Sequence, residues 1–130
     1  MKTNADKVAR MMAAFGQCVP VRPTLPDAAT VELRAALISE EYLEVIDAIN
    51  TKQTDIEHIV KELCDLLFVT YGTILSYGVN PDFAFNLVYK SNMSKIGING
   101  VPEKAPNGKV LKGAHYRSPD MFLIHTVENI

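Results

Sequence analysis

Two pairs of acidic residues have the spacing in this sequence that points most clearly to chemistry. Glu41 and Glu44 lie three positions apart, and so do Glu62 and Asp65 after an interval of seventeen residues. Residues three apart share one face of a helix, so two neighbouring helices would direct all four carboxylates into one small volume. Like charges crowd in this way only beside a cation, and several oxygen ligands suit Mg²⁺ or Mn²⁺. The spacing therefore predicts a divalent metal site.

The residues around these acids indicate burial and not a solvated face. Glu44 shares a helical stripe with Leu33 and Leu37, and apolar side chains cover the other sides of that segment. The second acidic pair borders a predicted core face formed by Ile59, Leu63, Leu66, Leu67 and Ile74. Carboxylates beside a core are costly unless a metal or protons neutralise them. Lys61, by contrast, is spaced to pair with Glu57 on an exposed surface.

Other metal-binding and nucleotide-binding motifs are missing from the chain. It contains no Glu-x-x-His pair of the di-iron type, no His-Glu-x-x-His and no glycine-rich phosphate loop ending in Lys-Ser/Thr. His58 lies one turn before Glu62 and could contact the acids, although a surface position at a helix start fits it better. His115 and His125 have no partners at ligand spacing. The predicted site therefore consists of oxygen ligands.

Apolar periodicity and end signals predict four helices that would position the acids. Their expected ranges are about 4–15, 27–50, 54–77 and 80–92. Asp27 or Thr30 would cap the second helix, and Thr54 with Glu57 forms a capping box that opens the third. The residues expected to end the first and third helices and to open the fourth are Gly16, Gly78 and Asn80-Pro81.

After Lys95 the signals change from helical periodicity to turns. Seven glycines and prolines fall within twenty-three residues, and Asn107-Gly108 is a tight-turn pair. We expect an ordered, mostly irregular C-terminal arm over about 96–130, with room for a small hairpin. The predicted fold class is all-α, a four-to-five-helix bundle over about 4–95 that forms a single domain with the arm.

Composition and charge exclude several kinds of partner. The net charge of −2 is too small to argue for nucleic acid or an anionic membrane. No apolar run reaches the ~20 residues of a membrane span, and the N-terminus does not resemble a signal peptide. Cys18 and Cys64 show no disulfide or metal spacing, which favours a reducing compartment, the cytoplasm. Residues 90–117 hold six basic side chains against Glu103 alone, which suits either a cationic flank for phosphates or ordinary solubility.

The order of the acidic motifs resembles the all-α nucleoside triphosphate pyrophosphohydrolases. Glu-Glu-x-x-Glu, which begins at Glu40, is followed by Glu-x-x-Asp on a neighbouring predicted helix, and the resemblance covers about residues 30–95. This superfamily includes MazG-like enzymes, all-α dUTP and dCTP pyrophosphatases and phosphoribosyl-ATP pyrophosphatase. The run 61–72 resembles its Glu-Leu-x-Asp-Leu-Leu signature. Segments 91–95 and 107–113 resemble a phosphoribosyl-ATP-pyrophosphatase-like or MazG-like subgroup often found in phages and bacteria.

The resemblance implies roles for the acids. Glu41, Glu44, Glu62 and Asp65 would bind Mg²⁺, with Glu40 in or beside that shell. Such enzymes cut between the α and β phosphates and release a nucleoside monophosphate and pyrophosphate. A triphosphate brings about four negative charges to these carboxylates, so bridging divalent ions are needed. Glu40 and Glu41 both remain candidates to accept the proton of the attacking water.

Basic and polar residues after the acidic helices are the predicted substrate contacts. They are Lys90, Asn92, Lys95, Lys109, Lys112 and Tyr116. The first three lie at the end of the fourth predicted helix and would contact phosphates or the base, and the two lysines of the arm would close over the nucleotide. The tyrosine either stacks on the base or anchors the arm to the core.

Enzymes that this chain resembles are usually dimers or tetramers, so we expect a homodimer first and a homotetramer second. Two other functions stay open. The chain could be a non-catalytic helical dimerisation or regulatory module, in which amides could replace the acids without loss. It could also be a phosphohydrolase that cuts elsewhere in the phosphate chain and releases inorganic phosphate. The sequence names neither the base nor the sugar of a substrate.

Overall fold

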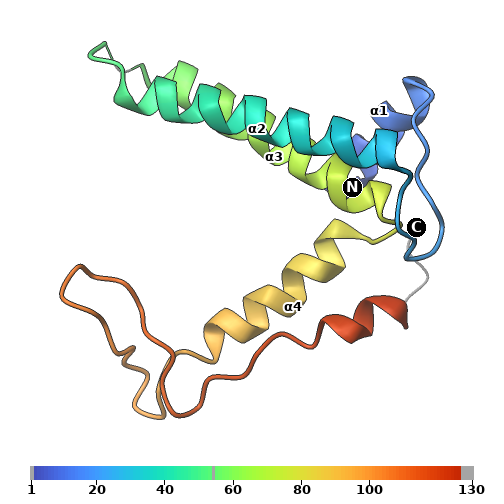
Figure 1. The fold of residues 1–130 in the computed structure, drawn as a ribbon. Coiled ribbons are helices and arrows are strands. Elements are labelled where there is room, and N and C mark those ends of the chain that lie inside the picture. Colours follow the sequence, from blue (N-terminus) through green and yellow to red (C-terminus); the bar gives the residue numbers. More distant parts are fainter. Residues whose placement is uncertain (1, 54, 127–130) are drawn as a thin grey trace. The chain divides into compact units, whose positions relative to one another are not determined.

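The chain is helical over most of its length (Figure 1). The computed structural model describes residues 2–53 and 55–126, and its α-helices are α1 (Asn4–Ala14), α2 (Ala28–Asn50), α3 (Ile56–Ser76) and α4 (Pro81–Met93). A short 3₁₀ helix, η1 (Met121–His125), follows in the C-terminal arm. The described residues contain isolated bridges but no strand, so the predicted all-α class is confirmed.

Most helix ends follow the predicted signals. Asp27 caps α2 by accepting a hydrogen bond from the backbone N–H of Thr30 at 2.8 Å. Gly16 and Gly78 follow α1 and α3 with φ of 70° and 69°. A Cβ on Gly78 would also collide with the backbone carbonyl of Arg22. Glycine is therefore needed there both for its φ and because residues 19–26, the proline-rich connector between α1 and α2, approach the end of α3 closely.

The predicted start of α3 needs a correction. Its N-cap is Asp55, whose carboxylate accepts a hydrogen bond from the backbone N–H of Glu57 at 3.0 Å. The predicted capping box placed the cap at Thr54, one residue too early, and Thr54 itself lies outside the described residues. Aspartate and threonine are both good N-caps, so the sequence pattern did not distinguish the two positions.

The apolar core lies between α1 and α3. Val8 and Met12 of α1 pack against Leu75 of α3, and all three side chains are buried. Val19 of the connector and Tyr71 of α3 add partly buried surface. The other long helix, α2, lies alongside α3 as its partner in a helical hairpin (Figure 1). This packing decides which faces of α2 and α3 meet, and so positions the acids.

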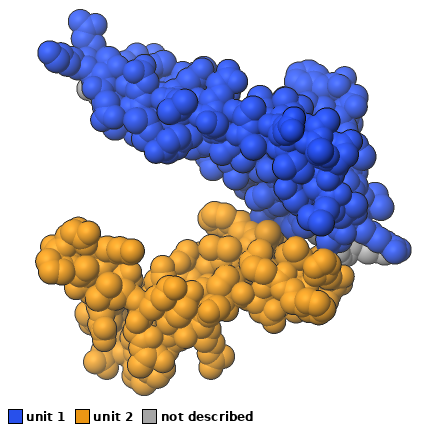
Figure 2. Space-filling view, viewed as in Figure 1, with its two compact units in different colours: residues 1–81, 128–130 blue, residues 82–127 orange. Residues whose placement is uncertain are grey.

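The chain divides into two compact units (Figure 2). The first contains α1, α2 and α3 and reaches Pro81, and the second begins at Asp82 and contains most of α4 and the C-terminal arm. In the second unit the arm returns to the end of α4. Ser91 Oγ donates to the carbonyl of Arg117 at 2.7 Å, and the Arg117 N–H donates to Ser94 Oγ at 2.8 Å. The arm is therefore ordered, as predicted.

The arm also contains the small hairpin for which the sequence left room. Lys104 and Val110 form an antiparallel bridge, and the N–H of Ala105 donates to the carbonyl of Lys109 at 2.8 Å. Gly108 has a φ of 86° at the turn, a conformation that glycine adopts at no steric cost.

The paired helices α2 and α3 leave much apolar surface exposed. The exposed side chains are Val31, Leu33, Tyr42, Leu43, Ile46 and Ile49 on α2, and Ile56, Val60, Leu63, Leu67 and Phe68 on α3.

The predicted burial of the second helix on nearly all sides is therefore wrong within this chain. The predicted core face of the third helix is wrong for Leu63 and Leu67, which are exposed, whereas Ile59, Leu66 and Ile74 are half-buried. The buried residues of α3 are Glu62, Gly72, Leu75 and Ser76. Even so, no described helix has the length and apolarity that crossing a membrane requires.

Candidate metal centre

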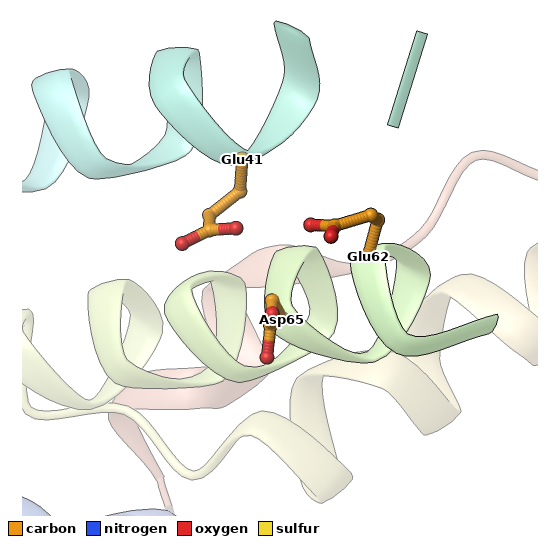
Figure 3. A group of neighbouring side chains, drawn as sticks. All are labelled: Glu41, Glu62 and Asp65. Carbon is orange, nitrogen blue, oxygen red and sulfur yellow. The ribbon is translucent and has the colours of Figure 1, made fainter. Parts of the chain in front are cut away.

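Three of the four predicted metal ligands meet between α2 and α3 (Figure 3). Glu41 points from α2 toward α3, where Glu62 and Asp65 lie one turn apart. One ligand oxygen from each residue lies within 4.8 Å of the other two. We call Glu41, Glu62 and Asp65 the acidic cluster. The three-residue spacing on α3 produces this geometry by placing both of its acids on the face toward α2.

The acidic cluster contains buried oxygen atoms that lack hydrogen bonds. Glu62 is 4% exposed, while Glu41 and Asp65 are half-buried. The Oε2 atoms of Glu41 and Glu62 are buried and have no hydrogen-bond partner among the described residues. Burial, followed by the charges of Asp65, Glu40 and Glu62, raises the pKa of Glu41. Unpaired buried carboxylate oxygens are costly, so this set of donors fits a divalent cation.

Glu44, the fourth predicted ligand, lies at the edge of the acidic cluster. Its side chain is exposed, and it is not one of the three residues whose oxygens lie within 4.8 Å. A hydrogen bond with Glu62, together with burial and the charges of Glu41 and Glu62, raises the pKa of Glu44. Glu40 is also exposed. The expectation that the acids of the second helix are buried is therefore wrong for Glu40 and Glu44, because α3 covers the Glu41 side of α2.

Two basic side chains of α3 contact the acidic cluster in the described part of the chain. Lys61 Nζ lies 2.8 Å from Asp65 Oδ2 and 3.1 Å from Glu62 Oε1, and His58 Nδ1 lies 3.4 Å from the same Glu62 oxygen. Hydrogen bonds with Asp65 and then Glu62 raise the pKa of Lys61. The prediction that Lys61 pairs with Glu57 is wrong. Asp65 is also one turn away, and the added charge of the cluster attracts the ammonium more strongly.

An open cavity of about 340 Å³ adjoins the acidic cluster. The residues that line it are Glu44, Asp47, His58, Lys61 and Glu62. At about 30 Å³ for each water molecule, the cavity has room for a phosphate group with its hydration water. The cavity is therefore lined both by acids that could face a metal ion and by basic side chains that could face a phosphate.

The predicted substrate contacts all lie in the second unit, where three of them gather. Lys112 Nζ lies 4.8 Å from the centre of the Tyr116 ring. A hydrogen bond with Ser91 lowers the pKa of Tyr116 most. A hydrogen bond with Ser118 and the charges of Lys112 and Lys95 lower this pKa further. Tyr116 thus joins the arm to α4 through Ser91. The other predicted contacts have exposed side chains and are Lys90, Asn92 and Lys109.

A buried arginine that the sequence pattern did not single out lies between the same two helices. Arg34 of α2 is 6% exposed, and its Nη2 donates to Gln17 Oε1 at 3.0 Å. On α3, a Cβ at Gly72 would lie 2.9 Å from Arg34 Nη1, so glycine makes room for the guanidinium. Arg34 lies seven residues before Glu41, and Gly72 lies seven after Asp65. Each shares a helix face with an acid of the cluster, and this shared spacing is the signal that could have revealed the pair.

The sequence matches a known family across the region that carries the acidic cluster. The sequence model of the phosphoribosyl-ATP pyrophosphohydrolase family matches residues 8–92, about two thirds of the chain. An uncharacterized protein of Acanthamoeba polyphaga mimivirus is 33% identical over 89 residues, which are 68% of this chain and 32% of the viral protein. The chain thus spans about a third of the length of this relative.

Proposed function

Because the chain belongs to the phosphoribosyl-ATP pyrophosphohydrolase family, we propose that it is a nucleotide pyrophosphohydrolase. It would cleave a (deoxy)nucleoside triphosphate or a related nucleotide between the α and β phosphates, releasing a monophosphate and pyrophosphate. One observation carries this proposal. Within the matched region, Glu41, Glu62 and Asp65 bring ligand oxygens within 4.8 Å of one another.

We assign the metal-binding role to the acidic cluster together with Glu44. Mg²⁺ is the expected ion and Mn²⁺ a substitute, because the ligand atoms of the acidic cluster and of Glu44 are carboxylate oxygens. A bound divalent ion neutralises phosphate charge and lowers the pKa of a coordinated water. The buried Oε2 atoms of Glu41 and Glu62 support this assignment, since a cation would satisfy both. Glu44 lines the adjoining cavity and would complete the ligand set from its open side.

Glu40 and Glu41 are the two residues that could accept the proton of the attacking water. Glu41 belongs to the acidic cluster, whereas Glu40 is exposed beside it and its charge helps to raise the pKa of Glu41. A general base must keep a carboxylate oxygen available for the proton, so we assign this role to Glu40. Under this assignment, Glu40→Gln lowers kcat and leaves Mn²⁺ affinity nearly unchanged, whereas Glu41→Gln lowers both.

We assign nucleotide binding in the second unit to the six predicted contacts. They are Lys90, Asn92, Lys95, Lys109, Lys112 and Tyr116. Lys112 lies over the Tyr116 ring, and the charge of Lys95 helps to lower the Tyr116 pKa, which supports a site for an anionic, aromatic ligand. The family match runs through α1, α2, α3 and most of α4 and so crosses the boundary between the two units. For this reason we treat residues 1–130 as one functional domain.

We also propose that the protein is a homo-oligomer, first a homodimer and second a homotetramer. The exposed apolar side chains of α2 and α3, with Leu43 and Leu67 among the most open, support this proposal. Monomeric proteins rarely keep apolar patches of that extent in water. We expect no nucleic-acid polymer and no membrane as partner. We place the protein in the cytoplasm, where both of its free cysteines would stay reduced.

A product assay tests the proposed reaction. Purified protein with Mg²⁺ is given a panel of canonical and modified (deoxy)nucleoside triphosphates and phosphoribosyl-ATP, and pyrophosphate and inorganic phosphate are measured separately. Pyrophosphate that disappears with EDTA supports the proposal. Inorganic phosphate alone would instead favour a different cleavage point. No product from a protein that also fails to bind Mn²⁺ would favour the non-catalytic module.

A further inference from the structure

The proposed function gives no role to Lys61, although its ammonium lies between two acids of the cluster. Its Nζ is 2.8 Å from Asp65 Oδ2 and 3.1 Å from Glu62 Oε1, while its side chain is 62% exposed. The helix alone does not explain this position. Lys61 lies in the second turn of α3, where the helix dipole does not favour a positive charge, and Glu57 offers the better-oriented pair one turn earlier. The charge of the acidic cluster therefore holds Lys61 in place.

The ammonium satisfies the acidic cluster only in part. It contacts one oxygen of Glu62 and one of Asp65, and the buried Oε2 atoms of Glu41 and Glu62 stay without partners in the described structure. A divalent cation would bring twice the charge to all three carboxylates. Two cations this close to the same oxygens repel each other strongly. Lys61 and a divalent ion therefore compete for the acidic cluster.

We propose that Lys61 is an internal counter-ion of the acidic cluster, which gives way when a divalent cation binds and then contacts a phosphate oxygen of the nucleotide. This inference rests on the proposed function, because it needs a metal and a phosphate at the same site. The cavity gives the displaced side chain a place, since Lys61 and Glu62 both line it. The exposed stem of Lys61 can change rotamer without disturbing the core.

The first test is the Mn²⁺ affinity of nucleotide-free protein, measured by titration with detection of free Mn²⁺ by electron paramagnetic resonance. Lys61→Met keeps the length of the stem and removes the competing charge, so it should bind Mn²⁺ roughly threefold more tightly or better. Lys7→Met removes the same charge from the exposed face of α1 and should leave the affinity unchanged. Unchanged or weaker binding by Lys61→Met would overturn the proposal.

A second test uses the wild-type protein and does not depend on a variant that folds. Lysine acetylation under limiting reagent is followed by mass spectrometry in metal-free protein, with Mg²⁺, and with Mg²⁺ and inorganic pyrophosphate. The modification rate of Lys61 should rise with Mg²⁺ and fall again with pyrophosphate, while that of the exposed Lys52 stays constant. A Lys61 rate that does not respond to Mg²⁺ would contradict displacement, and no fall with pyrophosphate would contradict the phosphate contact.

These outcomes separate the inference from the function on which it rests. Wild-type protein that binds no Mn²⁺ would remove both the proposed metal site and the role of Lys61. Wild-type protein that binds Mn²⁺ and releases pyrophosphate, with the same affinity in Lys61→Met, would remove the role of Lys61 alone.

Discussion

Two regions of the paired helices α2 and α3 bury charge in opposite ways. At one end, which we call the arginine end, Arg34 donates to Gln17 and lies against Gly72. Met12 packs there too, since its sulfur would lie 3.6 Å from a Cβ on Gly72. Nearer the middle of both helices, the acidic cluster holds three carboxylates whose buried oxygens are only partly satisfied.

One helix pair thus carries a packed region and a separate region of unsatisfied charge. The arginine end adjoins the core of Val8, Met12 and Leu75, so its buried charge sits among packed apolar side chains. In the acidic cluster, burial and the charges of Asp65, Glu40 and Glu62 raise the pKa of Glu41. A site that keeps such repulsion in the metal-free state has the most to gain from a cation. Substitutions in the acidic cluster should therefore change activity, and substitutions at the arginine end should change the free energy of unfolding.

The largest expected effect is the loss of hydrolysis when a ligand of the acidic cluster is removed. Glu62→Gln should lower pyrophosphate release by at least about 100-fold, because a lost metal ligand should exceed the 10–100-fold typical of an outer-shell change. Its melting temperature should stay close to that of the wild type. Glu57→Gln, an exposed change on the same helix, is the matched control and should keep nearly full activity. Pyrophosphate release by Glu62→Gln within tenfold of wild type would remove Glu62 from the site.

A substitution that leaves a cavity at the arginine end should lower stability and leave metal binding unchanged. Met12 is fully buried, so Met12→Ala should lower the free energy of unfolding by about 2–4 kcal/mol. Mn²⁺ affinity under folding conditions should not change. Urea denaturation measures the first property, and Met93→Ala, at an exposed methionine, should cost less than about 0.5 kcal/mol. Equal losses in the two variants would contradict the assignment of the core to this end.

Gly78, which follows α3, offers a smaller test of the packing at the arginine end. Gly16 and Gly78 have nearly the same positive φ, but only at Gly78 would a Cβ collide with the backbone of Arg22. Gly16→Ala should cost about 1 kcal/mol for its backbone conformation alone. Gly78→Ala should cost at least about 2 kcal/mol, because the connector must also move. Thermal denaturation of both variants measures the difference, and equal costs would show that the close approach is unimportant.

The smallest expected effect is a pH dependence of the metal-free protein. The pKa values of Glu41 and Glu44 are raised above their ordinary value of 4.5 in the folded protein. Their protonation therefore contributes its full share to folding stability only below about pH 4.5. This contribution is lost as the pH rises through the raised values. Metal-free Glu41→Gln should therefore melt about 1–3 °C above wild type at pH 7 and equal to it at pH 4. Asp27, whose pKa is lowered by Thr30, acts in the opposite direction but equally in both proteins. A variant that melts below wild type at pH 7 would show that Glu41 is not under repulsion.

Local rules predicted the parts of this molecule that neighbouring residues decide. The Asp27 cap and the glycines after α1 and α3 gave the helix bounds to within a residue or two. The spacing of Glu62 and Asp65 predicted that both carboxylates share a face, because that depends on the helix alone. The turn at Gly108 followed from an Asn-Gly pair in the same way.

Features that depend on how helices pack could not be read from the sequence. Helical periodicity gave Glu41 and Glu44 similar positions, and only contact with α3 places Glu41 inside and leaves Glu44 exposed. Apolar residues such as Leu63 and Leu67 were expected in the core, yet neither α1 nor α2 covers them. The spacing of Arg34 and Gly72 from the acids marks both residues, but they lie on distant segments, and only the packing of α2 against α3 brings them into contact.

The proposed function requires the acidic cluster to be a divalent metal site. The most direct test is the melting temperature of wild-type protein at pH 7, measured without metal and at increasing Mg²⁺. A ligand that binds the folded state alone stabilises it by RT ln(1 + [L]/Kd), so the melting temperature should rise with Mg²⁺ concentration. The same titration should leave Glu62→Gln unchanged. A wild-type melting temperature that does not respond to Mg²⁺ or Mn²⁺ would contradict the claim.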